Sequence, residues 1–131
     1  MLDTLRPRVE RSEWDKQLIR WKDRSARILL ASNEHREAYK CFESCRKASK
    51  NDWLRTRETW DLNNFVWYSQ MCASCLGHLG EPLRAKARLS QLNGFVALLR
   101  ERAAGDPSYL ATIQEYDRVY ELASRFAPKR R

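Results

Sequence analysis

The tryptophans of this chain are spaced by a repeat of seven residues. They fall at Trp14, Trp21, Trp53, Trp60 and Trp67, and only the gap from 21 to 53 departs from seven. Seven residues make about two turns of an α-helix, so residues at this spacing share one face. A β-strand alternates with period two and gives no reason for such a repeat. The spacing therefore predicts helices, and we expect the tryptophans to lie on the same buried stripes as Leu18, Ile28 and Met71.

The chain has 131 residues and a mass of 15.6 kDa, which is the size of one domain. A chain of this length can bury a core without disulfides or a metal ion. The longest stretch without a formal charge, residues 62–80, contains two asparagines, a glutamine and a histidine. We expect it to be a buried central helix and not a membrane span. No apolar segment follows the arginines of residues 1–11, so we expect no signal peptide and a cytoplasmic protein, or a nuclear one in a eukaryote.

Cap and turn signals divide the chain into five expected helices. The sequence predicts them at about 12–31, 34–50, 53–79, 82–104 and 107–126. In the third, the tryptophan spacing favours one continuous helix, whereas Thr59 and Asp61 favour a kink or restart near 60–62. Residues 1–11 are expected to form an irregular N-terminal arm and residues 128–131 a basic C-terminal tail. The prediction is an all-α fold in which residues 1–131 form a single domain, a bundle of about five antiparallel helices.

Several residues set these limits by their local chemistry. Ser12 is a good N-cap, and Asn51-Asp52 is a turn signal. Gly77 and Gly80 are expected to end the third helix as C-cap residues. The proline that follows Glu81 and the proline that follows Asp106 each suit the first position of a helix. Asp23 and Arg27 are expected to pair at i, i+4 on the first helix.

Two segments resemble the second half of a tetratricopeptide repeat hairpin. In the first, Ala38, Phe42 and Cys45 stand where that family places alanine, an aromatic and a small residue. In the second, Gly80, Ala85 and Leu89 match its glycine, alanine and large apolar positions. The two copies lie 47 residues apart, whereas the period of the family is 34. The resemblance implies stacked helical hairpins and a role in protein–protein interaction.

The four cysteines form two pairs, Cys41 with Cys45 and Cys72 with Cys75, each on one face of its own expected helix. If the two helices pack together, four thiolates could converge as a tetrahedral zinc site, with His35 or His78 as substitutes. The alternative, which we favour, is that free cysteines are small buried apolar residues. A thioredoxin-like role needs a thiol at a helix N-terminus, where the helix dipole lowers its pKa, and Cys72 and Cys75 lie near a helix end.

No catalytic arrangement stands out in the sequence. A nucleophile and its base need a histidine or a substitute in a cleft, and the chain has only His35 and His78. His35 opens an expected helix beside charged neighbours and is expected to be solvated. His78 lies at a helix end, where an imidazole is common. The sequence therefore predicts that the protein is not an enzyme.

The basic residues are the most informative functional signal. The net charge is +8, and arginine dominates, whose planar guanidinium suits phosphate. Arg84 and Arg88 share a face at i, i+4, where their repulsion is easier to understand if an anion lies against them. Trp53 opens an element amid cations and is the one tryptophan expected to stack on a base. The expected phosphate contacts are Arg46, Lys47, Lys50, Arg55, Arg57, Arg84, Lys86 and Arg88. The alternative is a solvated basic helix face.

These features predict a non-enzymatic helical subunit that contacts the phosphate backbone of RNA or single-stranded DNA within a larger nucleoprotein assembly. Its partners would be nucleic acid and other protein subunits, with no cofactor, no small-molecule substrate and no membrane. In size, charge and helical class the chain is similar to the helical small subunits of CRISPR effector complexes. Two alternatives stay open: a tetratricopeptide-like adaptor whose groove takes a partner peptide, and a phage or mobile-element regulator that acts by protein binding.

Overall fold

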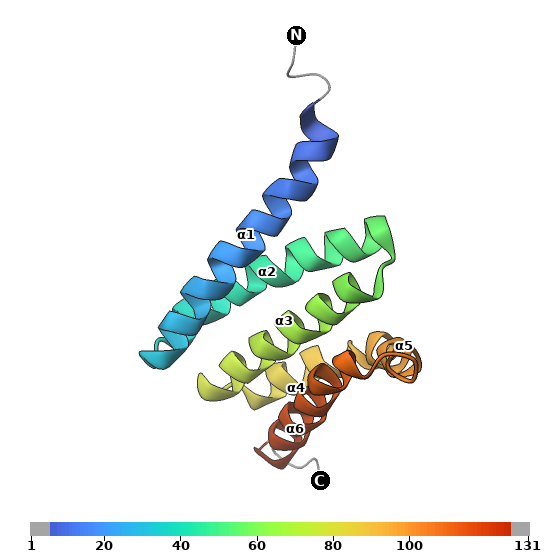
Figure 1. Ribbon diagram of the computed structural model, residues 1–131. Helices are drawn as coiled ribbons and strands as arrows, with labels where there is room; N and C mark the ends of the chain where they lie inside the picture. The colour runs from blue at the N-terminus through green and yellow to red at the C-terminus, as the bar shows by residue number, and fades with distance from the viewer. Residues whose placement is uncertain (1–5, 127–131) are drawn as a thin grey trace.

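The computed structural model describes the backbone of residues 6–126 and the side chains of residues 16–125. Helices dominate this part of the chain and no strand occurs in it, so the all-α prediction is confirmed (Figure 1). The helices are α1 (Arg6–Ala31), α2 (His35–Thr56), α3 (Thr59–His78), α4 (Pro82–Ser90), α5 (Asn93–Ala103) and α6 (Leu110–Phe126), with a 3-10 turn, η2 (Pro107–Tyr109), before α6.

Helix α3 lies at the centre and is covered on both sides. Helix α2 packs on one side of it and carries α1, while α4, α5 and α6 pack on the other (Figure 1). The core has two apolar clusters. Tyr68 and Cys72 of α3 belong to the cluster made with α1 and α2, and Leu62, Val66 and Leu76 belong to the cluster made with α4, α5 and α6. A helix buried on two sides has little room for charge, which explains the uncharged stretch and confirms the expected central helix. Within the described residues, no helix combines the length and apolarity that crossing a membrane requires.

Helix α1 begins earlier than the sequence predicts. It starts at Arg6, so Pro7 lies in its first turn, where a missing N–H costs no hydrogen bond. Ser12 is therefore inside the helix and is not its N-cap. The expected irregular arm is wrong for residues 6–11, which are helical. Residues 1–5 and the expected basic tail at 128–131 lie outside the described residues.

Helix α2 continues through the expected turn at Asn51-Asp52 and ends at Thr56. Asp52 and Trp53 are both buried, so tertiary packing overrides the local turn signal. Arg57 then takes the left-handed conformation, with φ of 56°, and its N–H donates to the carbonyl oxygen of Trp53 (2.9 Å). The chain therefore breaks at 57–58, before the expected restart at 60–62, and the interval from Trp53 to Trp60 spans two helices.

The tryptophans do not share one environment, so the prediction of a buried stripe is wrong in part. Trp53 is buried and Trp67 is half-buried, but Trp21 is 64% and Trp60 58% exposed. The reason on α1 is that Ile19, Ala26 and Leu30 pack on α2, and Trp21 lies off that stripe. The Trp14 side chain lies outside those described.

The expected helix 82–104 is two helices, α4 and α5, because the chain turns at Gln91-Leu92. The turn is held by Tyr116 of α6. Its hydroxyl donates to the carbonyl oxygen of Leu89 (2.8 Å) and lies 2.7 Å from Oδ1 of Asn93. The Leu89 carbonyl oxygen also accepts from the N–H of Leu92 (3.0 Å), so the Tyr116 hydroxyl is an additional partner that ties α6 to the turn. The described residues therefore hold six α-helices instead of about five.

The cap residues between α3 and α4 are confirmed in part. Gly80 has a φ of 79°, and the N–H of Glu81 donates to the carbonyl oxygen of Leu76 (2.9 Å), as in a Schellman cap. Gly77, also expected as a cap, lies inside α3. Pro82 opens α4 as predicted, and Pro107 opens η2. The expected pair on α1 is also present, with Arg27 Nε 2.9 Å from Asp23 Oδ2.

Two leucines of α4 test which face of that helix is buried. Leu89 is fully buried and Leu83 is 61% exposed. We expect Leu89→Ala to lower the free energy of unfolding by about 2–5 kcal/mol, because it leaves a cavity. Leu83→Ala should change it by less than about 0.5 kcal/mol. Urea denaturation measures both, and equal effects would contradict the orientation of α4.

Candidate functional site

Three of the predicted phosphate-contact residues meet in one hollow. Arg46 and Lys50 lie at i, i+4 on α2, and Arg88 reaches the same place from α4. The hollow has a volume of about 220 Å³. We call it the basic hollow, and its lining residues are Arg46, Lys50, Phe65, Ser69, Arg88, Gln91, Leu92 and Phe95.

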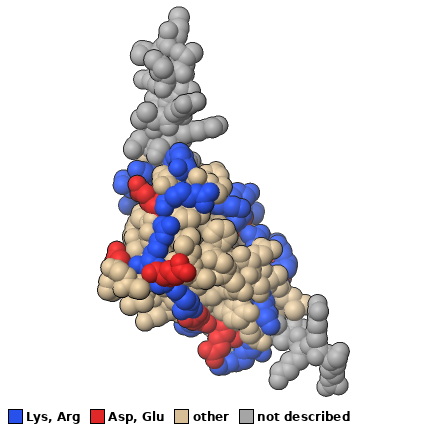
Figure 2. Space-filling model, turned by 90° about the vertical axis from the view of Figure 1, so that its right-hand side faces the viewer, with Lys and Arg blue, Asp and Glu red and all other residues tan. Residues whose placement is uncertain are grey.

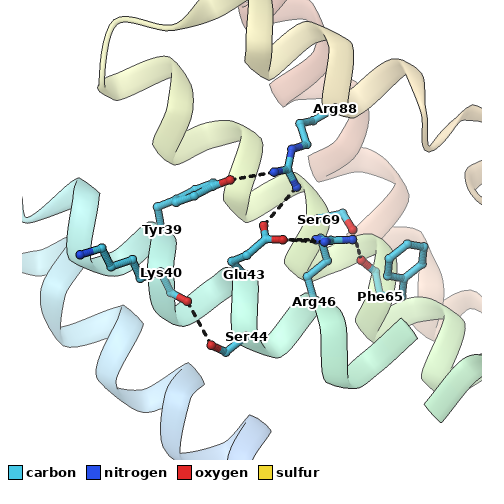
Figure 3. A network of polar contacts seen from close by, with 8 residues as sticks. All are labelled: Tyr39, Lys40, Glu43, Ser44, Arg46, Phe65, Ser69 and Arg88. Carbon is cyan, nitrogen blue, oxygen red and sulfur yellow. Dashed lines mark hydrogen bonds and ion pairs between the residues drawn. The ribbon is translucent and has the colours of Figure 1, made fainter. Parts of the chain in front are cut away.

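One carboxylate holds the two arginines in place (Figure 3). Glu43 Oε1 accepts hydrogen bonds from Arg46 Nη2 (2.5 Å) and Nε (3.0 Å), and Oε2 accepts one from Arg88 Nη1 (3.1 Å). Arg88 Nη2 donates to the Tyr39 hydroxyl (2.9 Å). A single negative charge thus faces two guanidinium groups, with the Lys50 ammonium beside them. The hollow keeps an excess of positive charge that an anion could neutralise.

The charges of this network fix the ionisation of Glu43. Burial alone would raise the pKa of its carboxyl group, but the hydrogen bond from Arg46 and the charges of Arg46 and Arg88 outweigh burial and hold the pKa below its usual 4.5. The same pairing raises the pKa of Arg46. At neutral pH the acid and both bases are charged, so the arrangement of donors is present before any ligand arrives.

One wall of the hollow is aromatic. Phe65 of α3 and Phe95 of α5 meet edge to face, with ring centroids 5.0 Å apart. The Ser69 hydroxyl donates to the Phe65 carbonyl oxygen (2.6 Å). Aromatic surface beside the cations excludes water from one side and lowers the local dielectric constant, which strengthens their attraction for an anion.

Three more of the predicted contacts lie on the same two helices but outside the hollow. Lys47 is exposed on α2, Lys86 is half-buried on α4, and Arg84 is exposed and pairs with Glu81 (2.9 Å). Because Arg84 pairs with Glu81 and Arg88 pairs with Glu43, their i, i+4 repulsion is already reduced. The spacing of these two arginines therefore does not by itself require a bound anion.

The remaining predicted residues lie together at the far end of α2. Arg55 pairs with the buried carboxylate of Asp52. Arg57 and Arg102, which comes from α5, place their guanidinium groups 5.3 and 5.2 Å from the centroid of the Trp53 ring. Trp53 is only 3% exposed, so its ring is not open to a base and the stacking prediction is wrong.

These arginines stabilise the corner between α2 and α3. Arg102 Nη1 donates to the Arg57 carbonyl oxygen (3.2 Å) and to the Thr59 hydroxyl (2.9 Å). Such contacts offset the strain of a left-handed arginine, which costs about 1–2 kcal/mol. Figure 2 shows the face at this end of the molecule, where blue Lys and Arg groups are spread over the surface with red Asp and Glu groups between them. Net charge alone therefore does not single out a site here.

Reasoning from the sequence did not identify functional residues that contact each other from distant positions in the chain. Glu43 and Tyr39 orient Arg88 from 45 and 49 positions away, and Arg102 reaches Arg57 from 45 positions away. No local pattern marks such pairs. The i, i+3 spacing of Glu43 and Arg46 was the one local pattern that pointed to this network. It predicts their ion pair but not the contacts of Arg88 with Glu43 and Tyr39.

The cysteines lie in or beside the core, as the favoured interpretation expects of small buried apolar residues. Cys45, Cys72 and Cys75 are buried, Cys41 is half-buried, and all four thiols are free. Burial raises the pKa of Cys75 to about 11 and that of Cys45 to about 12, and it also raises the pKa of Cys72. Among the side chains that the structure describes, no three histidine, cysteine or acidic groups converge as a metal site would require.

The two histidines stack on each other. Their rings lie 4.4 Å apart between centroids and 6° from parallel, which joins the start of α2 to the end of α3. His35 is half-buried, so the expectation that it is solvated is wrong.

No protein-family model, no curated protein and no solved structure matches this chain.

Thiol labelling tests the burial of the cysteines. With an aromatic disulfide reagent at pH 8, we expect Cys41 to react well before the other three thiols, because a buried thiol with a raised pKa supplies little thiolate. The Cys41→Ser variant should lose the fast phase alone. Mass spectrometry of the labelled peptides identifies the residue, and early labelling of Cys72 would contradict the packing described.

The pH dependence of stability tests the role of Glu43. Its folded-state pKa is lowered, so the stabilisation is complete above the ordinary pKa and is lost as the pH falls through the folded-state value. We expect Glu43→Gln to be less stable by about 1–3 kcal/mol at neutral pH. That difference should shrink as the pH falls below 4.5. Urea denaturation across the acid range measures it. Glu121→Gln, in an exposed pair with Arg125, is the control and should have little effect at any pH.

Proposed function

We propose that this protein is a non-enzymatic helical subunit that binds the phosphate backbone of RNA or single-stranded DNA within a larger nucleoprotein assembly. The observation that carries the proposal is the basic hollow, where Arg46 and Lys50 of α2 and Arg88 of α4 converge beside α3. Lys47, Arg84 and Lys86 lie on the same two helices and would extend the contact to neighbouring phosphates.

The size of the hollow favours a phosphate group over a small-molecule substrate. Its volume of about 220 Å³ lies below the range of ordinary ligand pockets, which is roughly 300–1,000 Å³. A guanidinium presents its donors as a planar fork that matches two phosphate oxygens. Glu43 engages one edge of Arg46, while Nη1 and Nη2 of Arg88 donate to Glu43 and Tyr39. Each guanidinium has five N–H groups, so each keeps further donors that an anion could use. Contacts of this kind position a strand and carry no base specificity.

The salt dependence of binding tests this function. Labelled RNA and single-stranded DNA are titrated with the protein at low and high salt, and affinity should fall steeply with salt. Lys50→Glu, at an exposed position, should weaken binding and reduce the slope of the logarithmic salt plot by about 1. Arg118→Glu makes the same charge change on α6, away from the hollow, and should leave the affinity within about twofold of wild type.

Two outcomes would overturn this proposal. One is an affinity that does not respond to salt. The other is an equal loss in Lys50→Glu and Arg118→Glu, which would show that only the total charge matters.

A second candidate function, a protein-interaction adaptor, is favoured by an apolar groove between α3, α4 and α6. The groove has a volume of about 500 Å³ and is lined by residues that include Ala73, Gly77, Pro82, Val119 and Leu122. It could take the apolar side chains of a partner peptide, as the tetratricopeptide resemblance implies. Co-purification from the native host separates the two candidates. A protein partner that Leu122→Glu releases, in a chain that binds no nucleic acid, would favour the adaptor.

A further inference from the structure

Helix α1 carries a second apolar stripe that does not face α2. The stripe that packs on α2 includes Ile19, Ala26 and Leu30, and α1 packs chiefly on that one helix. Trp21 is largely exposed, Ile28 is 62% exposed, and Leu18 and Ser25 between them are half-exposed. We call these residues the α1 seam: Leu18, Trp21, Ser25 and Ile28.

The seam has the spacing of a helix-packing surface. Its residues follow one another in steps of three, four and three, which is the heptad pattern that lets one helix lie along another. At 1.5 Å per residue the seam is about 15 Å long. The largely exposed Trp21 and Ile28 leave apolar surface at these positions that a partner would bury.

One flank of the seam is strongly basic. From residue 16 to residue 31, the exposed positions of α1 carry four cations and no carboxylate. The one acid of this segment, Asp23, is turned inward: it accepts a hydrogen bond from the Tyr68 hydroxyl (3.2 Å) and one from Arg27 Nε (2.9 Å). No ion pair joins Arg20 or Arg24 to another described side chain. The four exposed cations are Lys16, Arg20, Arg24 and Arg27, and at about 3.6 residues per turn they all lie on one flank of the seam. The half-buried Lys22 lies on the other flank.

This charge pattern selects the kind of partner. A second copy of the chain lying antiparallel along the seam would bring this basic flank against its own copy, which opposes pairing. A nucleic-acid strand could use the cations but not an aliphatic seam, because leucine and isoleucine cannot stack on bases. The Trp21 ring is also partly occupied as a stacking surface, because the Lys22 ammonium lies over it, 4.9 Å from its centroid. An amphipathic helix with an acidic flank satisfies both the apolar stripe and the cations.

We propose that the α1 seam is a docking surface for an amphipathic helix of a partner protein, with apolar residues in the seam and Asp or Glu on the flank that faces the four exposed cations. The surface is separate from the basic hollow, since α2 lies between α1 and α4. The proposal therefore does not depend on phosphate binding, and either can fail alone.

The test uses the full chain and two synthetic helical peptides of four heptads, with leucine in the seam positions. One peptide has glutamate at all flanking positions and the other has lysine. By fluorescence anisotropy we expect the acidic peptide to bind at micromolar concentration and the basic peptide at least about tenfold more weakly. Trp21→Glu and Ile28→Glu should each weaken binding of the acidic peptide about tenfold or more.

Two controls show whether the seam itself is responsible. Trp60→Glu removes another exposed tryptophan, on α3, and Lys50→Glu removes a cation of the basic hollow; both should bind the acidic peptide as wild type does. Because Trp21 and Ile28 are exposed, their variants should keep the thermal midpoint of the wild type, measured by circular dichroism.

Four results would overturn the proposal. They are failure of the acidic peptide to bind, equal weakening by Trp60→Glu, a wild-type dimer in sedimentation that Trp21→Glu converts to monomer, and a loss of RNA affinity in Trp21→Glu as large as that in Lys50→Glu. The third would assign the seam to a second copy of the chain, and the fourth would assign it to nucleic acid.

Discussion

The structure depends on the burial of α3 from two sides. Tyr68 and Cys72 join the apolar cluster made with α1 and α2, and Leu62, Val66 and Leu76 join the one made with α4, α5 and α6. The hydrophobic effect is not directional. A helix that is buried on two faces nevertheless determines where its neighbours pack, because each face accepts the helices that fit its side chains. Because α2 and α4 pack on this common helix, the cations of one come to face those of the other. The basic hollow is thus a result of how the core is assembled.

Within the hollow, Glu43 decides what the cations can do. Guanidinium groups brought together without an acid would repel one another and turn away into solvent. With Glu43 between them, Arg46 and Arg88 are held by hydrogen bonds and still outnumber the carboxylate. The far end of α2 shows the contrast: there, Arg57 and Arg102 lie against the Trp53 ring, and their role is to stabilise a corner. Basic residues that look alike in the sequence therefore divide into structural and available groups, according to which acid or ring each one meets.

Part of this architecture could be predicted from the sequence. The helical class, the buried central helix, the Gly80 cap and the Asp23–Arg27 pair all follow from short-range patterns, and all are confirmed. The tryptophan repeat shows the limit of such reasoning. Spacing tells which residues share a face of a helix, but the partner that covers a face comes from elsewhere in the chain. Trp53 was expected to be exposed to a partner and is buried, whereas Trp21 was expected to be buried and is exposed. The turn held by Tyr116 and the pairing of Arg88 with Glu43 also arise from distant residues, which no local window contains.

The assembly of the basic hollow from two helices links its occupancy to folding. Arg46 and Arg88 are 42 residues apart in the chain and meet only when α2 and α4 are both packed on α3. The unfolded chain has no such pair, so an anion that fits the hollow binds the native state alone. By mass action, a free anion concentration of about a hundred times the dissociation constant would then add about 2.7 kcal/mol to the free energy of unfolding. The melting temperature would rise with ligand concentration, and the amides of α2 and α4 would exchange their hydrogens more slowly.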